Sequence, residues 1–202
     1  MIRYGMVIDL KRCVGCQACT IACKVENFTP LGVFLARVLT KEYGEYPSVR
    51  REFWPVLCNN CADPACVKVC PTGATLQRED GIVTIDAQKC IGCRYCMMAC
   101  PYRVRFFLAR KESYFSTGPT PYESFGEEHK DYQTGTTVKC DFCLDRVDKG
   151  LEPACVRVCP AKARYFGDLN DPESEVSRLI TLRGGFQLLP EKGTDPSIYY
   201  LR

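Results

Sequence analysis

The chain has 202 residues, of which 16 are cysteine, and 27 Lys and Arg against 24 Asp and Glu give a formal net charge of +3. This balance is too even for a nucleic-acid surface, and the short basic runs at 49–53 and 102–110 are typical of solvated faces. No apolar run reaches the length of about 18 residues that a membrane span needs. The N-terminus carries no signal-peptide or twin-arginine pattern, so we expect no export address of the chain's own.

The first half of the chain is predicted to begin with a strand that leads into a cysteine-rich loop. Residues 2–9 (IRYGMVID) are rich in strand-forming residues, and a short helix should follow at about 17–26. Residues 28–53 are mixed in polarity, so we expect an inserted loop there. Loops of this length are functional or are covered by a partner.

The second half is predicted to repeat this organisation. Residues 81–86 read as a strand, and Glu-Asp-Gly just before it, between two β-rich runs, is a hairpin signal. A short helix should follow at about 94–100, and residues 107–135, within a stretch rich in Gly, Pro, Thr and Tyr, are predicted as a second inserted loop. Residues 171–202 form a C-terminal arm. The sequence leaves open whether this arm reaches another subunit or is an ordered terminus.

The cysteines fall into four sets of four, and none is left over. The first and third sets share their neighbours as well as their spacing, as IDLKRCVGCQACTIAC (8–23) and IDAQKCIGCRYCMMAC (85–100) show. The second and fourth sets end alike, in DPACVKVCPTGA (63–74) and EPACVRVCPAKA (152–163). The chain therefore repeats a pattern a, b, a, b, which indicates an internal duplication.

The spacing Cys-x2-Cys-x2-Cys-x3-Cys of the first and third sets is the run of bacterial ferredoxins, which binds [4Fe-4S] clusters. Gly15 and Gly92 suit a loop whose backbone must approach inorganic sulfide closely. Structural zinc takes paired cysteines, so a third close cysteine has no place in such a site. Only the fourth set, taken alone, fits a zinc clip equally well. Disulfides would join neighbours two residues apart, which seldom meet disulfide geometry.

Other catalytic chemistry is hard to find in the sequence. The single histidine, His129, lies in the polar stretch FGEEHKDYQ and is expected to be solvated. No Gly-rich phosphate or dinucleotide loop is present. We therefore predict an electron carrier that is not an enzyme by itself and has no direct small-molecule substrate.

The motifs CVGCQACTIAC, CNNCADPACVKVCPTGA, CIGCRYCMMACPY and KCDFC...GLEPACVRVCP occur in this order. In them the sequence resembles the four-cluster iron-sulfur subunits of the dimethyl sulfoxide reductase-type molybdopterin oxidoreductases, the family that includes polysulfide, thiosulfate, tetrathionate and arsenate reductases. The closing KGTDPSIYYL is similar to the tail of the polysulfide-reductase branch.

The resemblance implies an α+β fold of two nested bacterial-type ferredoxin (βαβ) units with long inserted loops. The repeats alone would also allow a tandem arrangement of the four sets. In the nested arrangement residues 1–27 and 136–170 form the outer unit, and residues 54–106 form the inner unit. The segments 28–53 and 107–135 are the inserted loops.

The resemblance also implies that the fourth cysteine of each run completes the ligand set of another cluster. Because Cys93 stands where some relatives have an aromatic residue and a three-iron cluster, we expect four [4Fe-4S] clusters. The implied ligands are Cys13, Cys16, Cys19 and Cys159 for cluster 1; Cys58, Cys61, Cys66 and Cys100 for cluster 2; Cys70, Cys90, Cys93 and Cys96 for cluster 3; and Cys23, Cys140, Cys143 and Cys155 for cluster 4.

Such a subunit relays electrons between a membrane anchor of several spans that interacts with quinone and a large catalytic subunit that holds molybdopterin with Mo or W. A free-standing polyferredoxin, or the electron subunit of a hydrogenase or formate-oxidising complex, is the alternative. We expect attachment to the cytoplasmic membrane through partners, on the periplasmic side by co-export, with a cytoplasmic location as the alternative. Four cationic residues lie close in sequence to the cysteine ligands: Lys24, Lys68, Arg94 and Arg157. They either raise the potentials of individual clusters or are solvated or partner-facing.

Overall fold

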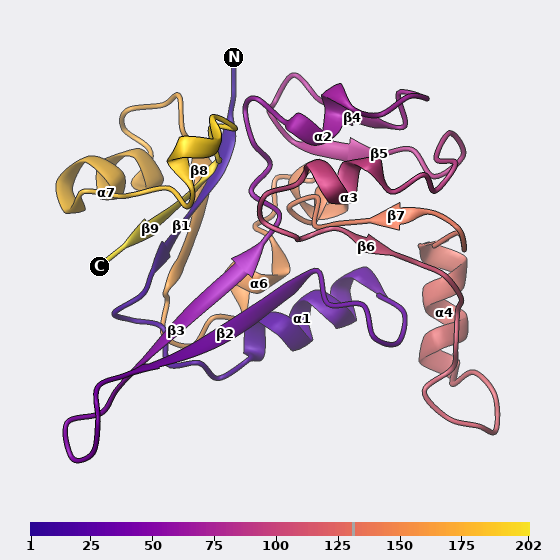
Figure 1. Cartoon of the computed structure of the whole chain (residues 1–202), viewed down its shortest axis with the longest axis horizontal. Coiled ribbons are helices and arrows are strands. Elements are labelled where there is room, and N and C mark those ends of the chain that lie inside the picture. Colours follow the sequence, from indigo (N-terminus) through magenta and orange to yellow (C-terminus); the bar gives the residue numbers. More distant parts are fainter. Residues whose placement is uncertain (131) are drawn as a thin grey trace.

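The structure, a computed structural model, describes residues 1–130 and 132–202. These residues form a mixed α+β protein of small sheets and mostly short helices (Figure 1). No helix in this part of the chain is long and apolar enough to cross a lipid bilayer. The strands are β1 Tyr4–Asp9, β2 Ala36–Tyr43, β3 Arg50–Leu57, β4 Thr75–Gln77, β5 Val83–Ile85, β6 Phe106–Phe107, β7 Thr137–Val138, β8 Arg164–Asp168 and β9 Ile198–Leu201. The helices are α1 Ala18–Asn27, α2 Ala65–Lys68, α3 Tyr95–Ala99, α4 Pro121–His129, α5 Leu144–Val147, α6 Ala154–Arg157 and α7 Glu175–Arg183, with a 3₁₀ turn at Pro190–Lys192.

The largest sheet joins the two ends of the chain. Strand β1, predicted at residues 2–9, lies between an antiparallel β8 and a parallel β9. Met6 and Ile8 face the main core, which contains several cysteines, whereas Val7 faces a smaller cluster with Val176 of α7 and Leu201. Both faces of β1 are therefore covered, and these three side chains of the strand are fully buried.

The C-terminal residues pack on their own chain. Strand β9 places Tyr200 in the core, where only 1% of the residue is exposed, and its hydroxyl donates a hydrogen bond to the carbonyl of Pro55 at 2.9 Å. Of the two interpretations left open for residues 171–202, these contacts support the ordered terminus, and an arm on another subunit stays a prediction.

The prediction of an inserted loop at residues 28–53 is wrong for most of that segment. Strands β2 and β3 form a long antiparallel hairpin, in register from Ala36 opposite Leu57 to Tyr43 opposite Arg50. Only the base of the hairpin is buried, and its tip projects from the body of the molecule (Figure 1). Since both faces of the outer half meet solvent, no alternation of polar and apolar residues marked these strands in the sequence.

The second insertion, residues 107–135, is also more than a loop. It contains α4, which begins with a capping box in which Thr120 and Glu123 bond each other's backbone N–H groups at 3.2 and 2.7 Å, and Pro121 occupies its first turn. Gly126 of this helix lies against the ring of Phe28, just after α1, leaving no room for a Cβ atom. The insertion therefore packs onto the end of α1.

The short helices beside the cysteines pack in two pairs. Helix α1 contacts α6, and α2 contacts α3. The predicted helices at 17–26 and 94–100 are confirmed as α1 and α3, and the predicted hairpin is confirmed as β4 and β5. The first and last cysteine sets thus share one part of the structure, and the two middle sets share another.

Candidate metal centres

The first site brings together an early and a late cysteine segment of the chain. One cavity is lined by Cys13, Cys16, Cys19 and Cys159. The backbone N–H of Ala163 donates to the Cys159 sulfur at 3.3 Å. Two thiols from the loop before α1, one from the first turn of α1 and one from the segment after α6 therefore surround a single space.

The second site lies in the middle of the chain. Its cavity is lined by Cys58, Cys61, Cys66 and Cys100, together with Thr194 from the C-terminal segment. Burial raises the pKa of the Cys61 thiol to about 12, although a hydrogen bond from the Thr194 side chain favours the thiolate. Thiolates form at such a place only when a cation compensates their charge.

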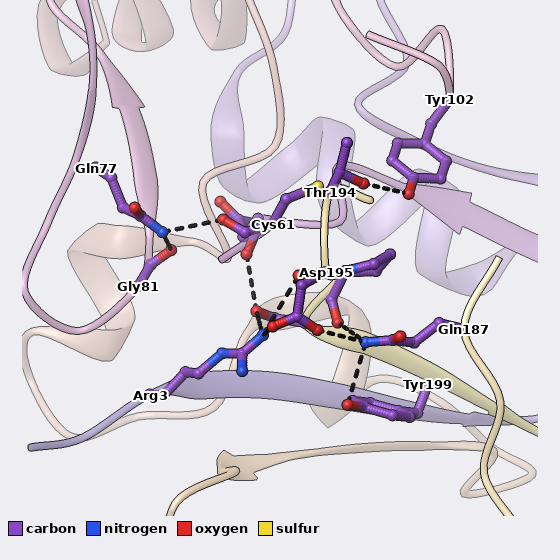
Figure 2. Close-up of polar contacts among 12 residues, drawn as sticks. Arg3, Cys61, Gln77, Gly81, Tyr102, Gln187, Thr194, Asp195 and Tyr199 are labelled. Carbon is purple, nitrogen blue, oxygen red and sulfur yellow. Dashed lines mark hydrogen bonds and ion pairs between the residues drawn. The ribbon is translucent and has the colours of Figure 1, made fainter. Parts of the chain in front are cut away.

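The C-terminal segment is held over this second site by polar contacts (Figure 2). The Thr194 and Tyr102 hydroxyls lie 2.7 Å apart, and the Gln77 amide donates to the carbonyl of Cys61 at 2.9 Å. Asp195 forms an ion pair with Arg3 at 3.0 Å. No pattern in the sequence indicated that the tail lines a cysteine site, because this contact joins residues far apart along the chain.

The site that Cys23 shares with three thiols of the fourth set is the most deeply buried. Cys23, Cys140, Cys143 and Cys155 are all buried, and burial, followed by the charges of neighbours that include the other three thiols, raises the pKa of Cys140 well above its usual value. The side-chain amide of Asn27 donates toward the sulfurs of Cys23 and Cys143 at 3.7 and 3.6 Å. Four thiols from α1 and the 140–155 segment thus share one neighbourhood.

The second insertion supports this buried site through Asn27. Lys130 donates to the Asn27 side-chain oxygen at 2.9 Å, and the Tyr132 hydroxyl donates to the Asn27 carbonyl at 2.7 Å. With its oxygen engaged, the amide of Asn27 is oriented with its NH₂ group toward sulfur. Residues 107–135 therefore help to fix a hydrogen-bond donor to the thiols.

The loop of the third set repeats the backbone of the first. Gly92 and Gly15 have φ values of 68° and 69°, and the residues before α3 and α1, Arg94 and Gln17, have φ values of 64° and 62°. The neighbouring elements differ, since Gly15 lies against the ring of Phe53 and Gly92 against the carbonyl of residue 135. Each insertion therefore covers one cysteine loop.

The thiols outside these three sites differ in exposure. Cys96 is buried with its sulfur 3.7 Å from the Thr137 hydroxyl, whereas Cys93 is exposed. The Cys70 sulfur accepts the backbone N–H of Thr75 at 3.4 Å. Cys70 and Cys90 are half-buried.

The donor chemistry of these sites fits iron-sulfur clusters. All 16 cysteines are free thiols, and within residues 1–130 and 132–202 no three His, Cys, Asp or Glu side chains are placed to hold one metal ion. Thiols that gather at one site but are not placed to hold a single metal ion match a cluster of several irons bridged by sulfide. The same arrangement argues against the zinc clip that the fourth set alone allowed.

The four cations singled out in the sequence do not contact sulfur. Lys68 pairs with Asp63, Arg94 stacks on the ring of Phe107 at 3.7 Å, and Arg157 is exposed. The ammonium of Lys24 donates to the backbone carbonyls of Thr29, Pro30 and Val33.

The cations found among the thiols are Arg105, Arg164 and Lys139, each buried. Sequence reasoning missed them. For the two arginines a signal existed, because CPYRVR (100–105) and CPAKAR (159–164) share the spacing Cys-Pro-x-x-x-Arg.

The chain resembles known proteins over its whole length. The 4Fe-4S dicluster domain family matches residues 49–116 and 108–169. The chain is 47% identical to the putative iron-sulfur subunit of a dimethyl sulfoxide reductase from Halobacterium salinarum, over 100% of this chain and 79% of the relative. It is 43% identical to the iron-sulfur subunit of the arsenate respiratory reductase of a Shewanella strain, over 100% and 97%, and 42% identical to a tetrathionate reductase subunit of Salmonella typhimurium, over 98% and 72%.

Proposed function

The chain belongs to the iron-sulfur subunits of the dimethyl sulfoxide reductase-type molybdoenzymes, and from this membership we propose that it relays electrons between a molybdopterin catalytic subunit and a quinone-interacting membrane anchor. It is an electron-transfer subunit with four [4Fe-4S] clusters, for which its 16 cysteines are sufficient. The observation that carries the proposal is the grouping of free thiols into separate sites.

In the proposed ligand sets, the fourth cysteine of each run completes the ligand set of another cluster. The cavity lined by Cys13, Cys16, Cys19 and Cys159 supports cluster 1, and the cavity lined by Cys58, Cys61, Cys66 and Cys100 supports cluster 2. Mutual electrostatic effects among Cys23, Cys140, Cys143 and Cys155 support cluster 4. Four cysteines remain, and we propose that they hold cluster 3: Cys70, Cys90, Cys93 and Cys96.

We propose that these sets belong to two nested units. The outer unit comprises residues 1–27 and 136–170, and the inner unit comprises residues 54–106. Pairing of β1 with β8 and packing of α1 on α6 support the outer unit, and packing of α2 on α3 supports the inner one. A tandem arrangement would instead require the first two sets to pack together.

When bound, each cluster accepts and releases one electron. The protein holds the clusters by thiolate and excludes water from the fourth site, where all four thiols are buried. Backbone and side-chain N–H groups, such as that of Asn27, donate to sulfur, which favours the thiolate and affects the reduction potential.

We propose that electrons enter and leave at two exposed thiols. Cys16 of the first set and Cys93 of the third are the exposed ones among the 16. Each has an apolar, solvent-exposed neighbour: Val14 is 60% exposed and Ile91 is 67% exposed. A surface that is apolar around a redox group suits docking of a protein partner, because docking excludes water there.

The test is anaerobic co-purification with the partner subunits, followed by metal analysis and redox titration by electron paramagnetic resonance. We expect about sixteen iron atoms per chain and four reducible clusters. Zinc at four or fewer atoms per chain, with no reducible signal, would contradict the proposal. A stable monomer that never binds a catalytic subunit would favour a polyferredoxin.

The location is proposed from the partners. Co-export with a catalytic subunit that carries a twin-arginine signal would place the chain on the periplasmic side, attached to the membrane through its anchor. Deleting the anchor subunit should release the chain into the periplasmic fraction of fractionated cells. Recovery in the cytoplasmic fraction alone would favour the cytoplasmic alternative.

A further inference from the structure

Three cations are buried among the thiols of this chain. Arg105 and Arg164 are each 4% exposed and Lys139 is 7% exposed. None of them takes part in the ion pairs found among residues 1–130 and 132–202. A buried charge without a carboxylate partner is costly unless another anion compensates it, and thiolates are the anions available here.

Arg164 lies between the proposed clusters 1 and 4. One guanidinium nitrogen, Nη2, is 3.4 Å from the Cys19 sulfur, and the other, Nη1, is 3.6 Å from the Cys155 sulfur. In the proposed pairing, Cys19 is a ligand of cluster 1 and Cys155 is a ligand of cluster 4. A single guanidinium therefore contacts ligands of two clusters.

Arg105 occupies the corresponding place in the inner unit. Its charge interacts with Cys66 and Cys58, proposed ligands of cluster 2, and with Cys96 of cluster 3. Arg105 lines the cavity of the second site, and its Nη1 donates to the Thr75 hydroxyl at 3.3 Å. This guanidinium is therefore fixed beside the thiols proposed to hold cluster 2.

Lys139 lies between the two halves of the molecule. Its ammonium donates to the carbonyl of Cys140 at 2.8 Å and to the side-chain oxygen of Asn60 at 3.3 Å. Its charge also favours the thiolate of Cys66. The cations therefore alternate with the thiol sets in the order cluster 1, Arg164, cluster 4, Lys139, cluster 2, Arg105, cluster 3.

We propose that Arg164 and Arg105 each raise the reduction potentials of two neighbouring clusters at once, clusters 1 and 4 for Arg164 and clusters 2 and 3 for Arg105. A fixed positive charge stabilises the reduced form of a cluster more than the oxidised form, because the reduced form is the more negative. Burial strengthens this effect by lowering the local dielectric. The arginines neither gain nor lose a proton or an electron.

This inference rests on the proposed ligand pairing, and the test keeps the two apart. The variants Arg164→Gln and Arg105→Gln are made in the full complex, purified anaerobically and titrated by electron paramagnetic resonance beside the unsubstituted complex. Arg157→Gln is the matched control, since Arg157 follows the ligand Cys155 but is exposed. Iron content is measured in every sample.

We expect each arginine variant to lower two of the four midpoint potentials, and the two variants to lower complementary pairs. Arg157→Gln should shift none by a comparable amount. A shift confined to one cluster, a uniform shift of all four, or the same pair in both variants would overturn the inference. Absence of four reducible clusters in the unsubstituted complex would instead contradict the proposed function.

Loss of clusters in a glutamine variant is judged with Arg164→Lys and Arg105→Lys. A lysine variant that binds full iron, with both potentials of the pair near those of the unsubstituted complex, supports the requirement for charge. If the lysine variant also lacks iron at that pair, the arginine is needed to assemble the sites, and a role in setting potentials is overturned. Another outcome is a lysine variant that binds full iron and yet lowers both potentials of the pair as much as expected for loss of the positive charge. This result would likewise overturn the role of the charge in setting potentials.

Discussion

At the scale of single residues, Cys13 and Cys159 lie far apart in the sequence but line one cavity. Cys140, by contrast, lies in the buried neighbourhood of Cys23. Cys140 and Cys159 belong to the same stretch of sequence, yet the structure directs them to different sites. Ligand membership therefore cannot be assigned from proximity along the chain.

The first prediction concerns this division. Cys159→Ala should damage cluster 1 and leave cluster 4 in place, because only cluster 1 loses a ligand, whereas Cys140→Ala should do the reverse. Both variants are compared by electron paramagnetic resonance and by iron content, which falls by up to about four atoms per chain when one cluster is lost. Loss of the same signal in both variants would disprove the proposed pairing.

Glycine is required at Gly92 for two reasons. Its φ of 68° is strained for residues with a side chain, and an added Cβ would meet the carbonyl of residue 135. We predict that Gly92→Ala destabilises the cluster-loaded chain by about 1–3 kcal/mol, seen as a lower thermal midpoint and faster iron release.

The matched control for this variant is Gly150→Ala. Gly150 has a φ of 72°, but no atom lies within 4 Å of its added Cβ. It therefore carries the backbone strain without the steric clash. Equal effects of the two substitutions would show that the covering insertion is not what restricts residue 92.

At the scale of elements, the hairpin of β2 and β3 has two parts with different surroundings. Its base packs in the core through Ala36 and Leu57, whereas Tyr46 at the tip is 93% exposed and Val49 is 51% exposed. An exposed, partly apolar hairpin tip contributes little to the stability of this chain. It is available for contact with a partner.

We predict that replacing residues 44–49 by Asn-Gly leaves the iron content and thermal midpoint of the chain unchanged. The same change should weaken co-purification with the partner subunits. The comparison variant is Phe53→Ala, which removes the ring that covers Gly15 and should lower the thermal midpoint. A shortened hairpin that binds partners normally would rule out a role at the interface.

The C-terminal segment stabilises the second site through Thr194. We predict that Thr194→Val, which removes the hydroxyl 2.7 Å from Tyr102, destabilises the loaded chain by about 0.5–1.5 kcal/mol because one hydrogen bond is lost, while the Tyr102 hydroxyl keeps the carbonyl of Leu188. The control is Thr117→Val at an exposed position. Equal thermal midpoints for the two variants would show that this contact does not hold the tail.

The sequence was informative where the ligand chemistry fixes the local backbone. The strand at β1, the helices α1 and α3 and the hairpin of β4 and β5 all lie beside cysteine runs whose spacing is typical of cluster-binding loops. The hairpin of β2 and β3 was not predicted, because most of it meets solvent on both faces. The role of Thr194 was not predicted either, since it depends on a contact between distant segments.

At the scale of the whole molecule, many core residues are cysteines. Cys19, Cys23, Cys58, Cys140 and Cys155 all belong to the main hydrophobic cluster, beside aliphatic and aromatic residues. Covalent bonds from thiolates to iron thus take the place of part of the ordinary packing. Binding of the clusters and folding of the chain are therefore coupled.

We predict that removal of iron by an anaerobic chelator unfolds the chain. The metal-free protein should lose its cooperative thermal transition and expose apolar surface to a hydrophobic dye, while the loaded protein should show neither change. Circular dichroism and dye fluorescence measured against remaining iron test this. A metal-free chain that keeps a sharp thermal transition would show that the core is sufficient without its clusters.

The central position of β1 has a consequence for biosynthesis. This strand is synthesised well before both of its partners, β8 and β9, which begin at Arg164 and Ile198. During translation its side chains Met6, Val7 and Ile8 therefore stay uncovered and open to aggregation until β8 and β9 have been made. The inner unit, whose cysteines lie between Cys58 and Cys100, can mature earlier. We therefore expect the chain to depend on a chaperone that shields β1 until its two partner strands have been synthesised.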